Sequence, residues 1–221
     1  FIIRIPALNR PLAQHHEWGT AHLLITLQIW KENGIHSYNY NPVFTFDNKG
    51  DKFPSDLGKL KDKNNNYYYI SYPPFVFYFP YFIFKLLNIY PDVLAVRLLN
   101  ITLHLLSSIL VYILICKICK QSVLNNLCVP ALVSACIYLF VPSNLWYLCN
   151  VFFVDTFSQT IFLLALLITF NLLFDDKFTY AKFFYLMCVL MLLSTTEYIG
   201  YLFIFILFIT VFFSSSIVKK K

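Results

Sequence analysis

Charge is what this sequence has least of. Only 13% of its 221 residues are Asp, Glu, Lys or Arg, whereas roughly a quarter of the residues of an average soluble domain are charged. Hydrophobic residues make up 59% of the chain, with 24 Phe and 16 Tyr. This composition excludes a disordered chain and argues strongly against a soluble globular domain. Apolar runs such as 101–116 and 151–174 are close to the roughly 20 residues that cross a bilayer, so we expect an all-α, polytopic helical membrane protein.

The common catalytic signatures are also absent. The sequence contains no GxxxxGK[ST], GxGxxG, HExxH or GxSxG run, so no motif supports a nucleotide-binding protein, a zinc protease or a hydrolase. The net charge is +6, but the basic residues form no stripe interleaved with aromatics, so nucleic acid is not an expected partner. Cys116 and Cys119 form a CxxC with neither a second pair nor a nearby His, which favours packing residues over a zinc site. We expect no metal and no cofactor.

The apolar runs predict about five complete membrane spans after the end of a first one at residues 1–8. The last run, 183–213, has 31 residues. As one helix it would be about 46 Å long, well beyond the roughly 30 Å hydrocarbon core. Polar residues at its centre and Gly200 predict two helices with a turn near 195–200. The expected spans occupy residues 93–116, 127–146, 151–174 and the two halves of 183–213.

The lysines near the span ends favour this hairpin. With two helices in the last run, all of these lysines fall on one side of the membrane, at positions 117, 120, 177, 182 and 219–221. The positive-inside rule makes that side cytoplasmic. We therefore expect one transmembrane domain over 1–221, with an extracytoplasmic or lumenal loop at 9–92 and transmembrane helices at 93–216. Because the chain begins with Phe and ends just after an apolar run, we expect it to be a fragment of a longer protein.

The loop contains two segments that suit a membrane surface. Residues 17–33 carry apolar side chains at helical spacing and predict an amphipathic helix in the interface plane. Trp18 and Trp30 suit the headgroup level, where aromatic residues concentrate. Residues 67–90 are aromatic and contain three prolines, which favours a re-entrant or interfacial segment over a straight span.

Three acids are candidates for chemistry. Glu17 follows His15 and His16, and a carboxylate flanked by imidazoles at a membrane surface can act as a general base. The alternatives are an acid favoured by the dipole at a helix N-terminus and, more weakly, a metal site. Asp155 opens the expected span 151–174, where an acid is functional, paired or an exposed N-cap. Glu197 is either a site residue or an interfacial turn residue.

Polar residues also form a stripe along the first complete span. Arg97, Asn100, His104 and Ser108 recur at helical spacing on an otherwise apolar helix. A guanidinium near the outer end of this helix can clamp a phosphate. The alternative is hydrogen bonding between helices, which we favour for the deeper His104.

These features together resemble the GT-C glycosyltransferases, and within them glycosyltransferase family 39. That family includes protein O-mannosyltransferases and bacterial aminoarabinose transferases for lipid A. The resemblance covers nearly the whole chain. It rests on the acidic motif after the first span, the long outer loop, Tyr72-Pro73-Pro74-Phe75 leading to Arg97-Leu98-Leu99, Asp155 opening the fourth span, and the hairpin at 193–200.

The resemblance implies transfer of a sugar from a polyprenyl-phosphate carrier, with inversion, to an acceptor lipid, glycan or protein. The reaction would take place on the outer face of a bacterial inner or plasma membrane, or in the lumen of an ER-type membrane, in contact with membrane lipids. An acid of the first loop would act at the acceptor, and cations would hold the carrier phosphate. The implied catalytic residues are His16, Glu17 and Asp155, and the implied substrate-binding residues are His15, Tyr72, Lys85, Arg97 and Glu197.

The sequence departs from the family pattern at three positions. His16-Glu17 replaces the usual Asp-Glu pair, so Glu17 or a His would have to take the role of that Asp. Tyr72 and Glu197 each stand where the family commonly has a Lys. The carrier phosphate would therefore depend on Arg97, Lys85 or residues outside this chain. Two other hypotheses remain: a transporter whose intramembrane acids bind ions or protons, and a non-catalytic membrane scaffold.

Overall fold

The computed structural model describes residues 5–13, 16–46, 60–71, 73–120, 127–152, 154–174 and 179–218. Within these residues the regular structure is helical, and the remainder includes two isolated β-bridges in the loop, Val43 with Tyr68 and Lys61 with Tyr67. The expected all-α class is confirmed for this part of the chain. The helices are α1 (Ile5–Leu8), α2 (Trp18–Asn33), the 3₁₀ helix η2 (Ile35–Tyr38), α3 (Phe75–Leu86), α4 (Val93–Ile118), α5 (Val129–Phe140), α6 (Pro142–Asn150), α7 (Val154–Phe174), α8 (Tyr180–Thr196) and α9 (Ile199–Val218).

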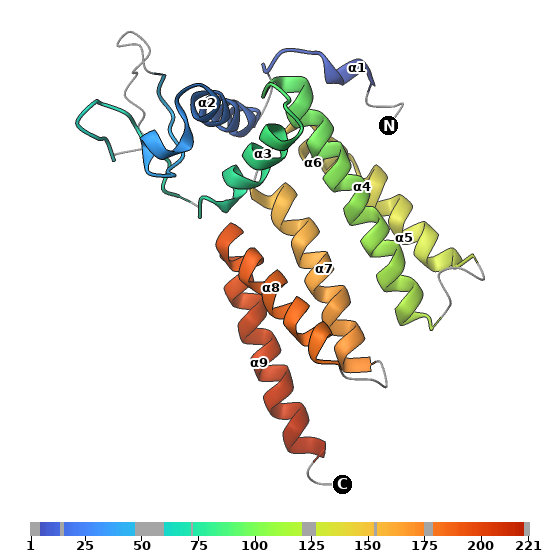
Figure 1. The fold of residues 1–221 in the computed structure, drawn as a ribbon. Coiled ribbons are helices and arrows are strands. Elements are labelled where there is room, and N and C mark those ends of the chain that lie inside the picture. Colours follow the sequence, from blue (N-terminus) through green and yellow to red (C-terminus); the bar gives the residue numbers. More distant parts are fainter. Residues whose placement is uncertain are drawn as a thin grey trace.

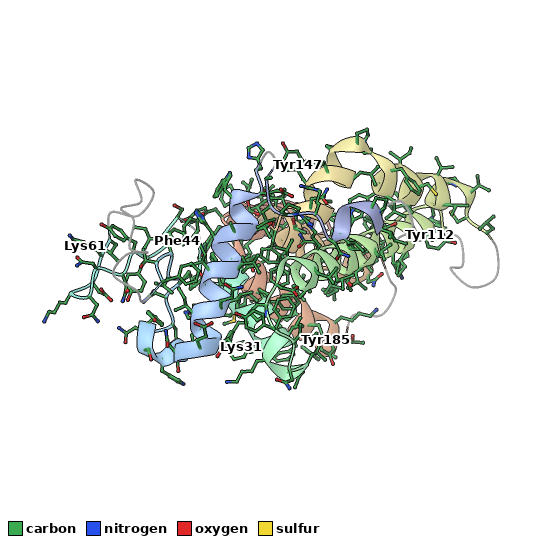
Figure 2. All side chains as sticks on the ribbon, turned by 90° about the horizontal axis from the view of Figure 1, so that it is seen from above. Lys31, Phe44, Lys61, Tyr112, Tyr147 and Tyr185 are labelled. Carbon is green, nitrogen blue, oxygen red and sulfur yellow. The ribbon has the colours of Figure 1, made fainter. Side chains whose placement is uncertain are left out.

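The longer helices form a bundle that is covered at one end (Figure 1). α4 packs against α5 and α7, and α8 packs against both α7 and α9. α2 and α3 lie at one end of the bundle, which we call the α2 end and which Figure 2 views from above. α4, α7 and α9 run away from the α2 end, whereas α5 and α8 run back towards it (Figure 1). The chain thus crosses the length of the bundle repeatedly, as a polytopic membrane protein does.

Fewer helices than expected are long and apolar enough to count as membrane spans by length and composition. In the described part of the chain, α4 and α7 are long and apolar enough to cross a bilayer, and α5 with α6 makes a third span if the pair counts as one. α8, with 17 residues, and the part of α9 whose side chains are described, Ile199–Thr210, are shorter apolar helices. A membrane protein with two or three spanning helices is supported, whereas the expected count of about five is not confirmed.

The expected span at 127–146 is not one helix. α5 ends at Phe140, and α6 starts at Pro142 with its axis turned by 62°. Val141 between them has φ −55° and ψ 127°, outside the helical region. The proline ring disfavours helical backbone at the preceding residue, which explains the break. The bend directs α6 to the α2 end, where it forms part of the candidate site.

The predicted hairpin is confirmed. α8 ends at Thr196 and α9 begins at Ile199, so the turn falls where the sequence predicts it. The two helices approach closely at Gly200, where a Cβ atom would lie 2.6 Å from the backbone nitrogen of Ser194. Only glycine fits this contact without displacing backbone atoms.

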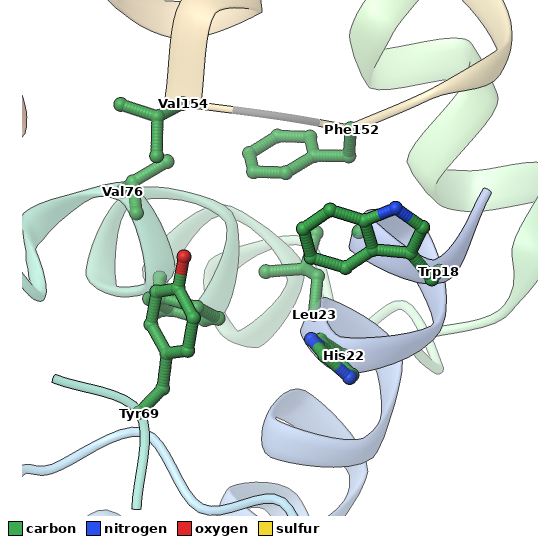
Figure 3. Close-up of a pocket in the computed structure, with 9 residues that line it drawn as sticks. Trp18, His22, Leu23, Tyr69, Val76, Phe152 and Val154 are labelled. Carbon is green, nitrogen blue, oxygen red and sulfur yellow. The ribbon is translucent and has the colours of Figure 1, made fainter. Parts of the chain in front are cut away.

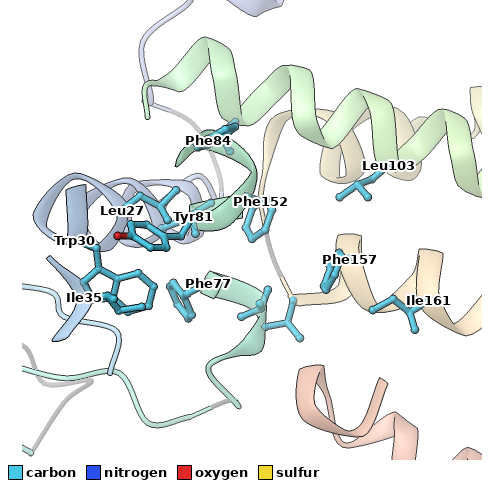
Figure 4. Packing of buried hydrophobic residues seen from close by; sticks show 14 of the residues in the cluster. Leu27, Trp30, Ile35, Phe77, Tyr81, Phe84, Leu103, Phe152, Phe157 and Ile161 are labelled. Atoms are coloured by element: carbon cyan, nitrogen blue, oxygen red, sulfur yellow. The ribbon is translucent and has the colours of Figure 1, made fainter. Parts of the chain in front are cut away.

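α2 is packed into the protein more deeply than an interfacial helix. Its buried residues include Leu23, Leu27 and Trp30, which join one apolar cluster with side chains of α3, α4 and α7 (Figure 4). Trp18 is 44% exposed, but Trp30 is fully buried, and its ring packs against Tyr81. The expectation that Trp30 lies among the headgroups is therefore wrong. The large rings of α3 supply the apolar partners that cover it.

The segment before α4 is short and helical. α3 has 12 residues with Pro80 inside it. At 1.5 Å per residue this is about 18 Å, too short to cross a bilayer. α3 packs on α2 and α8 at the α2 end. This short helix fits the expected re-entrant or interfacial segment. α1 has four residues, and residues 1–4, which complete the expected end of a first span, lie outside the described residues.

Candidate functional site

Glu17 is buried between two arginines. Only 2% of Glu17 is exposed. Its Oε1 accepts a hydrogen bond from Nη2 of Arg97 at 3.2 Å, and its Oε2 accepts from Nη1 of Arg10 at 3.0 Å and from the backbone N–H of Ala13 at 3.0 Å. Glu17 occupies the N-cap position of α2, but its side chain makes no capping bond to that helix. The carboxylate instead joins α2 to α4 and to the segment before α2.

Arg97 is turned towards the protein and not towards a cavity rim. Its side chain is fully buried, and Nη1 donates to the backbone carbonyls of Leu8 at 2.8 Å and Arg10 at 2.6 Å. Together with the bond to Glu17, these contacts fasten the start of the chain onto α4. This placement differs from the expected phosphate clamp, and it fits the alternative that the polar stripe holds helices together. In the same stripe, His104 Nε2 lies 3.3 Å from the carbonyl oxygen of Leu139 in α5.

Asp155 and Glu197 line one pocket at the α2 end of the bundle. This pocket, which we call the Glu197 pocket, has a volume of about 370 Å³. Ser158 Oγ donates to Oε2 of Glu197 at 2.6 Å. Both acids are therefore near polar groups that can bind hydroxyls. The polar lining comes from α6, α7 and the α8–α9 turn: Ser143, Asn144, Tyr147, Asp155, Ser158, Gln159 and Glu197.

Asp155 also lines a second pocket, together with His16. This His16 pocket has a volume of about 350 Å³ and shares Tyr147, Leu148 and Asp155 with the Glu197 pocket. The rings of His16 and Tyr147 lie 5.5 Å apart. His16 has a backbone φ of +63°, a left-handed conformation that non-glycine residues rarely adopt and that is concentrated at functional sites. The structure thus brings together His16, Asp155 and Glu197 around two adjoining pockets.

Arg10 is a cation that the sequence interpretation did not select. Its side chain is 20% exposed and forms an ion pair with Glu17. Its guanidinium lies 5.1 Å from the ring centroid of Trp146. Trp146 precedes Tyr147 in α6, so Arg10 lies near the polar wall of the two pockets. No sequence pattern marked Arg10 as a site residue, because Trp146, which it contacts in α6, lies more than a hundred residues away in the chain.

Ser158 and Gln159 were missed as well, although a signal exists for them. They follow Asp155 at i+3 and i+4, positions that share a face of a helix. Asp155 is the acid of the first turn of α7, and both residues line the Glu197 pocket with it. A search for polar neighbours of Asp155 at helical spacing would have found both.

The remaining predicted site residues that the structure describes do not join this cluster. Lys85 is exposed on α3 and lines a different pocket. His15 and Tyr72 lie outside the described residues. Glu17 and Arg97 line neither pocket that contains Asp155. Within the described ranges, no group of three or more His, Cys, Asp or Glu side chains is placed to hold a metal ion.

A smaller pocket adjoins the site but is too small for a sugar. Its volume is about 30 Å³, which holds one or two water molecules at most. Trp18, His22 and Tyr69 line it (Figure 3). Burial lowers the pKa of His22, so its ring stays neutral at neutral pH. The ring packs 4.2 Å from that of Phe44, which makes His22 a packing residue of the loop.

The arrangement can bind a polar ligand and move a proton. Two carboxylates, an imidazole, a phenol, hydroxyls and side-chain amides face adjoining pockets of sugar-sized volume. Comparison of the sequence with protein-family models found no matching family. No curated protein and no solved structure matches the chain significantly. The resemblance to the GT-C glycosyltransferases therefore depends on the sequence motifs alone.

Proposed function

We propose that this protein is a membrane glycosyltransferase that takes a sugar from a polyprenyl-phosphate carrier and transfers it to an acceptor on the extracytoplasmic or lumenal face. The observation that carries the proposal is the position of Asp155, which lines both the His16 pocket and the Glu197 pocket. Two adjoining pockets that share an acid suit a reaction in which a donor and an acceptor meet. The motifs that resemble family 39 support a polyprenyl-phosphate sugar as the class of donor.

The proposed step is a direct displacement. An acceptor hydroxyl attacks the anomeric carbon, the bond from that carbon to the carrier phosphate breaks, and the phosphate leaves with the bonding electron pair. The hydroxyl proton passes to the imidazole of His16, since histidine is the most frequent general base in enzymes. Asp155 offsets the charge of the imidazolium. The configuration at the anomeric carbon inverts.

This proposal changes the role expected for Glu17. A carboxylate that is 2% exposed and bonded to two arginines is a poor general base, because both charges that stabilise it oppose protonation. Glu17 is instead a positioning residue that holds the backbone of His16 at the pocket. Arg10, which keeps part of its exposure, is the proposed partner of the carrier phosphate.

Transport of protons or cations is the second candidate. It is favoured by one observation: Asp155 and Glu197 line the same pocket, and no lysine or arginine lines it with them in the part of the chain that is described. Intramembrane acids without a cationic partner frequently bind a transported ion. Uptake of Na⁺ or H⁺ into proteoliposomes, abolished in Asp155→Asn, would select this function over glycosyl transfer.

The test of the glycosyltransferase is donor consumption in proteoliposomes that contain the full-length protein. Polyprenyl-phosphate mannose and polyprenyl-phosphate aminoarabinose are supplied separately, with cell membranes as the acceptor source, and released polyprenyl phosphate is measured. His16→Gln and Asp155→Asn should each lower the rate by about 10²-fold or more, because each removes a group from the reacting centre.

Two matched variants control for these substitutions. His36→Gln and Asp92→Asn make the same chemical changes at residues that line neither pocket. His36 is exposed, and asparagine keeps the capping ability of Asp92 at the start of α4. Both variants should retain the wild-type rate. Consumption of neither donor above a protein-free control would overturn the proposed function.

A further inference from the structure

A separate pocket between α2 and α3 combines cations with aromatic side chains. It has a volume of about 240 Å³ and lies between the second half of α2, the end of α3 and the turn that leads into α4. It shares no lining residue with the His16 pocket or the Glu197 pocket. We call it the lysine pocket after Lys31 and Lys85. Its floor is aromatic, with Trp30, Tyr81 and Phe84.

Both lysines hold their ammonium groups against aromatic rings. Nζ of Lys31 lies 4.9 Å from the ring centroid of Tyr90 and donates to the carbonyl of Ile89 at 3.3 Å. Nζ of Lys85 lies 5.6 Å from the ring centroid of Tyr81. Figure 2 shows Lys31 at the end of α2. Two positive charges are thus directed to one pocket from two different helices.

Among the described residues, no carboxylate neutralises this pair of charges. No lining residue of the lysine pocket is acidic, and neither lysine forms an ion pair with any of the residues described in the structure. Asp92 follows the lining residue Pro91, but its Oδ1 accepts a hydrogen bond from the backbone N–H of Ala95 and caps α4. The pocket therefore offers positive charge to an anionic ligand.

The surroundings of the pocket indicate a lipid rather than a soluble anion. Large apolar side chains beside it are exposed, and Leu86, directly after Lys85, is 85% exposed. α4, which starts just after the pocket, is long and apolar enough to span a bilayer. Apolar side chains beside lysines and tyrosines are typical of the level at which headgroups meet acyl chains. The exposed apolar residues are Leu86, Leu87, Ile89, Tyr90, Leu94 and Leu98.

We propose that the lysine pocket binds the phosphate headgroup of an anionic glycerophospholipid of the surrounding bilayer. The two ammonium groups contact the phosphate, the rings of Trp30 and Tyr81 line the space beside it, and the acyl chains extend along the exposed leucines. The bound lipid joins α2, α3 and the start of α4 at the membrane surface. This site is separate from the proposed sugar-transfer site and does not depend on that function.

Native mass spectrometry of the full chain in detergent tests the site. The protein is titrated with dioleoyl-phosphatidylglycerol and, separately, with dioleoyl-phosphatidylcholine. Wild type should bind the anionic lipid about tenfold more tightly than the zwitterionic one. Lys31→Gln/Lys85→Gln should lose that preference, since each basic residue near a membrane surface contributes several-fold to the affinity for anionic lipid.

A matched pair controls for total charge. Lys61→Gln/Lys63→Gln removes the same charge from exposed residues of the loop and should keep the preference. Lys31→Arg/Lys85→Arg should keep it as well, and this variant serves if the glutamine pair does not fold. Equal binding of both lipids by wild type, or a preference that survives in the glutamine pair, would overturn the proposal.

Two further titrations distinguish the source of the phosphate. Inorganic phosphate at millimolar concentration should not displace phosphatidylglycerol; full displacement would assign the pocket to a soluble anion. Polyprenyl phosphate should bind the lysine pocket no more tightly than phosphatidylglycerol. Tighter binding that needs the same two lysines would assign the pocket to the carrier and would overturn its assignment to a bilayer lipid.

Discussion

At the scale of single residues, the bonds of Glu17 decide how the beginning of the chain is held. Its carboxylate compensates Arg97, which is fully buried. Removing one partner of a buried ion pair leaves the other charge without compensation, which costs about 3–5 kcal/mol. We therefore expect Glu17→Gln to lower the free energy of unfolding by about 3 kcal/mol, measured by denaturant titration in mixed micelles.

The same change at an exposed acid provides the control. Glu32 lies on the same helix and is exposed. The variant Glu32→Gln should therefore change the free energy of unfolding by less than about 1 kcal/mol. Replacing both charges, in Glu17→Gln/Arg97→Met, should recover part of the lost stability, because no unpaired charge then remains. Equal stability of Glu17→Gln and wild type would contradict the buried pair.

The sequence could predict that these residues matter but not what they contact. Glu17 was selected because two imidazoles flank its carboxylate, and Arg97 because a guanidinium near the outer end of a span can clamp a phosphate. Their pairing joins residues 80 positions apart in the chain, and no periodicity reports a contact of that range. Asp155 was selected as the acid that opens a span, and the structure places it there, in the first turn of α7.

At the scale of helices, the contact between α8 and α9 depends on the absence of a side chain at Gly200. A Cβ there would lie 2.6 Å from the backbone nitrogen and 2.7 Å from the Cα of Ser194. Backbone atoms cannot move aside as a flexible side chain can, so Gly200→Ala must shift α9 along or away from α8. We expect a loss of stability of about 1–3 kcal/mol, the usual cost of overpacking.

Thermal unfolding in detergent, followed by circular dichroism, measures this loss. Thr195→Ala changes an exposed residue of the same hairpin and should leave the midpoint nearly unchanged. A midpoint for Gly200→Ala equal to that of wild type would show that the helices do not approach at this position.

Helix positions followed from the sequence where local signals were strong. The span predicted to begin at residue 93 does begin there, because Asp92 Oδ1 accepts from the backbone N–H of Ala95 and caps the helix. The hairpin followed from length and charge. The break at Val141 was missed, although Pro142 carried the signal. Burial of Trp30 needed the aromatic partners from α3, which only the packed structure supplies.

At the scale of the whole molecule, the polar site and the lysines at the ends of the long helices occupy opposite ends of the bundle. The α2 end contains the two pockets lined by Asp155, whereas Lys117 lies in the last turn of α4, at the far end, and Lys120 follows that helix (Figure 1). α8 begins at the far end too, with Lys182 in its first turn. A sugar on a lipid carrier would meet its acceptor only if the α2 end is the extracytoplasmic or lumenal end. The proposed reaction therefore requires the same orientation in the membrane that the lysines at the far end of the bundle indicate.

We predict that the α2 end faces away from the cytoplasm, and cysteine labelling in intact cells tests this orientation. Lys61→Cys places a thiol on the exposed loop at the α2 end, and the exposed Cys119 lies at the far end, just after α4. Each is studied as the single cysteine of a variant whose other cysteines are replaced by Ser or Ala. A membrane-impermeant maleimide should label Lys61→Cys in intact cells, or in intact vesicles oriented lumen-outward. It should label Cys119 only after permeabilisation, because lysines near span ends stay on the cytoplasmic side. The reverse pattern would place the His16 and Glu197 pockets in the cytoplasm, where no lumenal acceptor could reach them, and the proposed glycosyl transfer would fail together with the orientation.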